Sequence, residues 1–137
     1  MILTDTGYWV ALGNRKDRWH LHAINVSRTI RDELLVTWPV VTETCHLLRA
    51  RVSETAQVRF LEQVKHVAQL FRLEWAHLER CQLLMHKYAD LPMDFADASL
   101  VIAAEELGHG RILSTDQRDF ETYRWKNHHP FQNLLIP

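Results

Sequence analysis

Four acidic residues, widely spaced along the chain, have positions that suit a shared site: Asp5, Glu43, Asp97 and Asp116. Asp5 follows the short apolar run 1–4, and Asp116 comes shortly after another apolar run. Glu43 and Asp97 each fall in the first turns of a segment with helical periodicity. Carboxylates brought within a few ångströms raise one another's pKa unless a divalent cation compensates their charge. The set therefore predicts a metal site.

The ligand types indicate which cation such a site prefers. Oxygen ligands without paired cysteine or histidine favour Mg²⁺ or Mn²⁺ over zinc, and these ions keep waters and suit phosphate substrates. A cation held in this way activates water for attack on phosphorus and neutralises charge on the leaving oxygen. The expected chemistry is hydrolysis of a phosphate ester.

Each acid also has a purely structural explanation. Asp5 can cap the helix that follows it, Glu43 and Asp97 can complement helix dipoles, and Asp116 can stabilise a turn. The four together favour a shared site over four unrelated roles. Asp94 lies three residues before Asp97, so the two carboxylates can share a helix face. Asp94 is thus an accessory candidate as well as an ordinary residue of a helix N-terminus.

Short apolar runs alternate with longer amphipathic stretches, which predicts a parallel sheet covered by helices on both faces. The expected strands are 1–4, 34–38, 70–75, 111–114 and, at an edge, 131–136. The expected helices are 8–13, 19–32, one starting at Pro39, 53–67, 76–89 and one from about Asp94 to Gly108, with a short turn at Asp119 and Phe120. The fold class is α/β, with a mostly parallel sheet of four to five strands.

This order of elements explains why the four acids should meet. In open parallel sheets, ligands collect beyond the carboxyl ends of the strands, where helix N-termini also point. Asp5 closes the first strand, and Asp116 follows the strand 111–114. Glu43 and Asp97 lie in helices that begin near the same rim, so their side chains can reach the acids at the strand ends.

Composition limits the class of protein. A chain of 137 residues with 47% hydrophobic residues suits a single domain over 1–137 with one core. With a net charge of -1 the chain has no overall positive charge to attract nucleic acid, so any contact with nucleic acid must come from a local group of residues. Cys45 and Cys81 fit free thiols of a reducing cytoplasm. No run of about 18 apolar residues is present, so neither a signal peptide nor a membrane span is expected.

Four segments carry a resemblance to a known family. They are ILTDTGYWVAL from Ile2, TETCHLL from Thr42, DFADASL from Asp94 and LSTDQRDF from Leu113. In order and spacing they resemble PIN domains, over nearly the whole chain. In size, and in lacking additional domains, the chain is similar to the VapC-type toxins of prokaryotic toxin–antitoxin pairs.

The resemblance implies a PIN-like three-layer fold in which Asp5, Glu43, Asp97 and Asp116 bind the metal. It also implies that Thr115 hydrogen-bonds within the site and that Thr6 orients the first turn. Many family members have serine where this chain has Gly7, so a hydroxyl common in the pocket is missing here. The implied activity is Mg²⁺-dependent cleavage of RNA by a homodimer. The implied partner is a small antitoxin that occupies the groove and inserts a basic side chain among the acids.

Basic and aromatic residues supply candidates for RNA contacts. Phosphate contacts are expected from residues after the first helix and at the end of the helix with Glu43, and the members of this set are Arg15, Lys16, Arg18, Arg49 and Arg51. Arg118 and Lys126 are further candidates near Asp116. Tryptophans at 9, 19 and 38 favour core or interface positions over base stacking.

Two other functions compete with a metal-dependent endoribonuclease. The first is a catalytically weak PIN-fold binding module that docks RNA or an antitoxin, against which the intact acid set argues. The second is a phosphatase of the haloacid-dehalogenase type, which also begins with an aspartate after the first strand. That family needs a second aspartate two residues later, where this chain has Gly7.

Overall fold

A five-stranded parallel sheet forms the centre of the molecule, with strand order β3-β2-β1-β4-β7. The computed structural model describes residues 1–137. The strands of this sheet are β1 (Ile2–Thr4), β2 (Leu34–Thr37), β3 (Ala68–Phe71), β4 (Arg111–Leu113) and β7 (Gln132–Asn133). A separate antiparallel pair joins β5 (Arg124–Trp125) to β6 (His129–Pro130). The predicted α/β class and strand number are confirmed.

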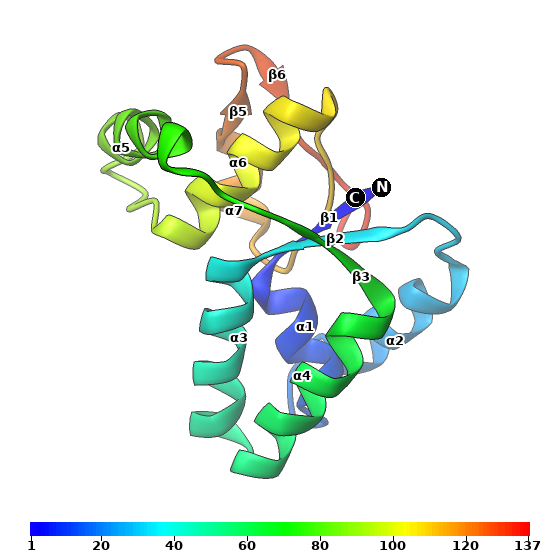
Figure 1. The fold of residues 1–137 in the computed structure, drawn as a ribbon. Coiled ribbons are helices and arrows are strands. Elements are labelled where there is room, and N and C mark those ends of the chain that lie inside the picture. Colours follow the sequence, from blue (N-terminus) through cyan, green and yellow to red (C-terminus); the bar gives the residue numbers. More distant parts are fainter.

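Helices pack on both sides of this sheet, as Figure 1 shows. They are α1 (Thr6–Gly13), α2 (His20–Thr29), α3 (Trp38–Arg51), α4 (Glu54–Val67), α5 (Leu78–Lys87), α6 (Phe95–Leu107) and α7 (Gln117–Thr122). Helices α1 to α4 group below the sheet in the view, and α5 to α7 lie above it (Figure 1). None of the helices is both long and apolar enough to span a bilayer.

The core is built from the central strands and from α6. Both β1 and β4 are almost wholly buried, as strands of a doubly covered parallel sheet must be. Helix α6 buries eight of its residues from Ala96 to Ala104, so it is apolar nearly all round. Gly108 ends α6 in the left-handed conformation, at φ 78°, which suits a residue without a Cβ. The site at the N-terminal end of α6 therefore rests on a rigid support.

The third strand begins and ends earlier than expected, so the prediction 70–75 is wrong at both ends. β3 pairs with β2 in parallel register from Leu34↔Ala68 to Thr37↔Phe71. The alternation that suggested a longer strand continues into a loop and a short 3₁₀ helix, η1 (Trp75–His77), which Glu74 caps. Pairing with β2, rather than local alternation, fixes the strand.

Two other boundaries differ from the prediction. β2 ends at Thr37, whose hydroxyl accepts a hydrogen bond from the amide of Val40, so Trp38 is already the first residue of α3. The edge strand expected at 131–136 shrinks to Gln132–Asn133. The Asn133 side chain accepts from the amides of Ser114 and Leu135, which turns the chain out of the sheet direction.

Candidate metal centre

Asp5 stands at the carboxyl end of β1 and is fixed by two hydrogen bonds. Its Oδ1 accepts from the amide of Thr6 at 2.8 Å, and its Oδ2 accepts from the Ser114 hydroxyl at 2.8 Å. The parallel pairing of β1 with β4 brings Ser114 there across 109 residues of sequence. Asp5 is only 5% exposed. Asp5 caps α1, as the structural explanation required. Its second oxygen accepts the hydrogen bond from Ser114, which follows β4.

The pKa of Asp5 shows that other carboxyl groups lie close by. Burial raises it from 3.8 to about 7, the hydrogen bonds from Ser114 and Thr6 oppose that rise, and the charges of Glu43 and Asp116 add to it. Residues from β1, α3 and the end of β4 thus act on one another electrostatically. The structure brings these three predicted site residues to the same rim.

Asp97 and Asp94 form a capping box at the start of α6. Asp94 Oδ1 accepts from the amide of Asp97 at 2.8 Å, and Asp97 Oδ2 accepts from the amide of Asp94 at 3.4 Å. Asp97 Oδ2 also accepts from the Tyr123 hydroxyl at 3.1 Å. Burial, followed by the charges of Asp5 and Asp94, raises the pKa of Asp97 from 3.8 to about 8. Asp97 therefore faces Asp5, whereas Asp94 is exposed and is the N-cap of the helix.

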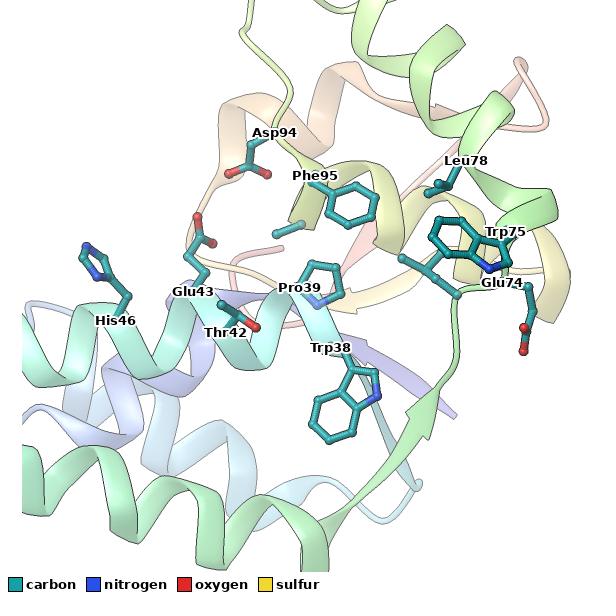
Figure 2. Close-up of a pocket in the computed structure, with 12 residues that line it drawn as sticks. Trp38, Pro39, Thr42, Glu43, His46, Glu74, Trp75, Leu78, Asp94 and Phe95 are labelled. Carbon is teal, nitrogen blue, oxygen red and sulfur yellow. The ribbon is translucent and has the colours of Figure 1, made fainter.

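Glu43 reaches the rim from the second turn of α3. It is partly buried, and burial is the largest cause of its raised pKa, with the Asp94 charge adding to the rise and Thr6 opposing it. Figure 2 shows the carboxyl groups of Glu43 and Asp94 directed toward one another. Asp94 is consequently the neighbour of Glu43 as well as of Asp97, which agrees with its expected accessory position.

Asp116 follows β4 and is the N-cap of α7. Its Oδ1 accepts from the amide of Asp119 at 3.2 Å, and its own amide donates to Ser114 Oγ at 2.9 Å. Burial is the main cause that raises its pKa from 3.8 to about 6, with the Asp119 side chain adding to the rise. Asp119, expected only as a turn residue, is 7% exposed and lies beside the site.

Sequence reasoning missed two residues that hold the acids in place. Ser114 donates to Asp5, and Tyr123, which is fully buried, donates to Asp97. The hydrogen bond to the site expected from Thr115 is thus made by Ser114, one residue earlier. The sequence did offer a signal for Ser114: its hydroxyl comes two residues before Asp116, at the end of the strand expected next to that of Asp5. Nothing in the sequence pointed to Tyr123, because its contact depends on how α7 packs against α6.

The donor set fits Mg²⁺ or Mn²⁺. All four acids offer oxygen, and the pKa of each carboxyl is raised, with burial as the largest cause. The buried hydroxyl of Thr6 lies beside Glu43 and lowers its pKa, although no protein group lies at hydrogen-bond distance from Thr6 Oγ1. No group of three or more His, Cys, Asp or Glu side chains lies close enough together to enclose a metal ion of any kind. An open arrangement suits Mg²⁺, which keeps several waters and takes one or two carboxylates.

A groove leads from these acids along the surface. It has a volume of about 820 Å³, and Glu43 and Asp94 form part of its wall. Figure 2 shows the rings of Pro39, Phe95 and Trp75 along the groove on one side of the two carboxylates, and His46 on the other side. Glu43 and Asp94 therefore open onto a surface channel, whereas Asp5, Asp97 and Asp116 do not line it.

Comparisons with known proteins show which proteins this chain is similar to. No protein-family model matches the chain. Ribonuclease VapC26 of Mycobacterium tuberculosis is 27% identical over 124 residues, which cover 90% of this chain and 92% of VapC26. The crystal structure of M. tuberculosis VapC20, described as a Sarcin–Ricin loop cleaving toxin, superposes with a TM-score of 0.78. That match covers 85% of this chain and 90% of VapC20 at 21% sequence identity. The chain is similar in sequence to VapC26 and has the PIN-domain fold of VapC20.

The glycine at position 7, where the resemblance to PIN domains led us to expect serine, has a structural counterpart. A Cβ placed on Gly7 would lie 1.9 Å from Thr115 Oγ1. The Thr115 hydroxyl therefore occupies the space that a side chain at position 7 would need. Residue 7 has no hydroxyl, but the hydroxyl of Thr115 lies beside it.

The basic residues expected to contact RNA lie away from the four acids. Arg15, Lys16 and Arg51 line a second cavity, which none of the four acids lines. Arg49 is exposed and lies 3.7 Å from the carboxylate of Glu54. Arg15, Lys16 and Arg49 are thus not brought to the carboxylates. Arg15 and Lys16 follow the C-terminal end of α1, and Arg49 and Arg51 lie in the last turn of α3, so these helices separate them from the acids.

Proposed function

We propose that this protein is an endoribonuclease that uses Mg²⁺ or Mn²⁺ to hydrolyse RNA phosphodiesters. The observation that supports it best is the raised pKa of Asp5, Asp97 and Asp116, at about 7, 8 and 6, at the rim of a parallel sheet. Carboxylates held in this state are stabilised by a divalent cation. VapC26 is named a ribonuclease, which makes RNA the substrate to test first.

The protein's own residues would divide the work between binding and positioning. Asp5, Glu43, Asp97 and Asp116 would hold the cation, Ser114 would orient Asp5, and Tyr123 would orient Asp97. The cation would supply Lewis acidity to water and to the phosphate. Hydrolysis adds the water oxygen to phosphorus and breaks one phosphorus–oxygen bond of the chain. No protein nucleophile is needed, and none of the acids must form a covalent bond.

The wider biological role follows from the same relatives. We infer that the protein acts as the toxin of a type II toxin–antitoxin pair, as a homodimer in the cytoplasm, with a small antitoxin as its partner. VapC20 is described as a toxin, which supports this role. Induced expression should then arrest growth, and co-expression of the antitoxin or the change Asp97→Asn should relieve the arrest. Undiminished arrest by the Asp97→Asn protein would contradict this role.

Cleavage of labelled RNA tests the proposed activity. The wild-type protein should cut RNA with Mg²⁺ and lose activity in EDTA, and Asp97→Asn should lower the rate by at least about 100-fold. Asp90→Asn is a matched control, because Asp90 is exposed and lies outside the groove. Equal cleavage by wild-type and Asp97→Asn proteins would contradict the proposal. Binding of RNA without cleavage by the wild type would favour the binding-module alternative instead.

A further inference from the structure

The groove next to the acids carries aromatic side chains that the fold itself does not bury. Trp75 is 88% exposed, Trp38 58% and Phe95 41%. They come from η1, from the first residue of α3 and from the first residue of α6. All three line the groove that also contains Glu43 and Asp94. Trp38 was expected to be a core or interface residue, and in this chain it is exposed.

The backbone that carries Trp75 and Trp38 is held in place although their rings are exposed. Trp75 begins η1, where Glu74 and His77 form a capping box. His77 Nε2 is also bonded to Glu106 of α6 at 2.5 Å. Pro39 follows Trp38 and restricts the backbone in the first turn of α3. A rigid aromatic surface loses little conformational entropy when a planar ligand binds to it.

The charges of the groove decide which part of a nucleic acid it can take. Its ionisable side chains are Glu43, Glu74, Asp94 and His46, so acids outnumber the single residue that can become cationic. Phosphate groups are repelled by such a wall except where a divalent cation offsets the carboxylates. The apolar part of the groove therefore suits the uncharged base of a nucleotide whose phosphate lies at the acids.

Resting on the proposed function, we propose that the groove lined by Trp38, Trp75 and Phe95 binds an unpaired nucleobase of the RNA next to the phosphate that is cut. Its volume of about 820 Å³ is within the range of ligand pockets and accommodates a nucleotide. Stacking on aromatic rings requires a base that is free of its partner strand. The groove would therefore take only a base that is unstacked and unpaired at the cleavage site.

The test measures cleavage of a short single-stranded RNA and of the same sequence in a duplex. Trp75→Ala should raise KM for the single strand about 5- to 100-fold with kcat within about twofold. Trp75→Phe should keep most of the affinity, and Trp75→Leu should lose it, because leucine is apolar but cannot stack. Leu83→Ala is the control, since Leu83 is 58% exposed on α5 and lies outside the groove. An unchanged KM in Trp75→Ala, or full affinity in Trp75→Leu, would overturn the proposal.

Binding without cleavage separates this proposal from the proposed function. Anisotropy of a fluorescein-labelled single-stranded RNA should show weaker binding to Asp97→Asn/Trp75→Ala than to Asp97→Asn. That result supports the base site even if the wild-type protein cuts no RNA. The mass of each variant in solution, by light scattering, is measured in parallel. Conversion of a dimer to a monomer by Trp75→Ala would assign the groove to a second copy of the chain and overturn the base site.

Discussion

The hydroxyl of Thr115 occupies the space beside Gly7, at 1.9 Å from the position of a Cβ on that glycine. The two residues belong to different elements, since Gly7 lies in the first turn of α1 and Thr115 follows β4. One of the two positions must therefore stay small. The relationship links Gly7 to a neighbour 108 residues away in sequence.

The first prediction concerns this pair. Gly7→Ser should lower the free energy of unfolding by about 1–3 kcal/mol, because a Cβ there overlaps Thr115. Gly7→Ser/Thr115→Ala should recover most of that loss, since the remaining contact is to Thr115 Cβ at 3.1 Å. Urea denaturation measures both effects. If the double variant is as unstable as the two single changes together, the two positions do not share this space.

The second prediction concerns Ser114. Its hydrogen bond opposes the rise in the pKa of Asp5, so Ser114→Ala should raise that pKa further above about 7. Less of the carboxyl is then ionised at neutral pH. The pH at which RNA cleavage reaches half its maximum should move upward. Thr122→Ala, which removes an exposed hydroxyl on α7, is the control. An identical pH profile for Ser114→Ala and wild type would exclude this role.

The third prediction concerns stability against pH without metal. The folded protein raises the pKa of Asp97 from 3.8 to about 8 and that of Asp5 to about 7. Between pH 4 and pH 8 the unfolded chain therefore binds fewer protons than the folded protein, and stability falls as pH rises. In EDTA, Tm should be lower at pH 8 than at pH 5. Asp97→Asn should raise Tm at pH 8 by about 2 °C or more and should have a smaller effect at pH 4.

Calorimetry over this pH range, with and without Mg²⁺, checks the third prediction. Mg²⁺ should stabilise the wild-type protein more at pH 8 than at pH 5, because ionised carboxylates bind it better. Asp90→Asn should behave as wild type at each pH. A metal-free protein whose Tm rises from pH 5 to pH 8 would contradict the assigned pKa shifts.

The sequence predicts the acids better than it predicts their supports. Asp5 and Asp116 could be placed because an apolar run before each one indicates a strand, and parallel strands end at one rim. Glu43 and Asp97 followed from helical periodicity. The contacts of Ser114 with Asp5 and of Tyr123 with Asp97 span 109 and 26 residues, and they depend on strand register and helix packing. Such distances lie outside any local pattern.

The exposure of Trp38 and Trp75 is a second feature that the sequence did not predict. Composition and spacing favour burial for a tryptophan, and Trp9 is indeed 5% exposed and donates to Thr4 Oγ1. Trp38 and Trp75 look similar in sequence, yet one begins a helix and the other begins a 3₁₀ turn at the surface. The register of β3 against β2 decides where this turn begins, and that register is a tertiary property.

Titration with Mn²⁺ by isothermal calorimetry at pH 8 tests the central claim most directly, since it measures metal binding by the four acids without any substrate. The wild-type protein should bind Mn²⁺, and Asp5→Asn and Asp97→Asn should each weaken binding by at least about tenfold. The control Asp90→Asn should bind as the wild type does. Equal Mn²⁺ affinity and stoichiometry in wild-type, Asp5→Asn and Asp97→Asn proteins would show that these carboxylates are not a metal centre.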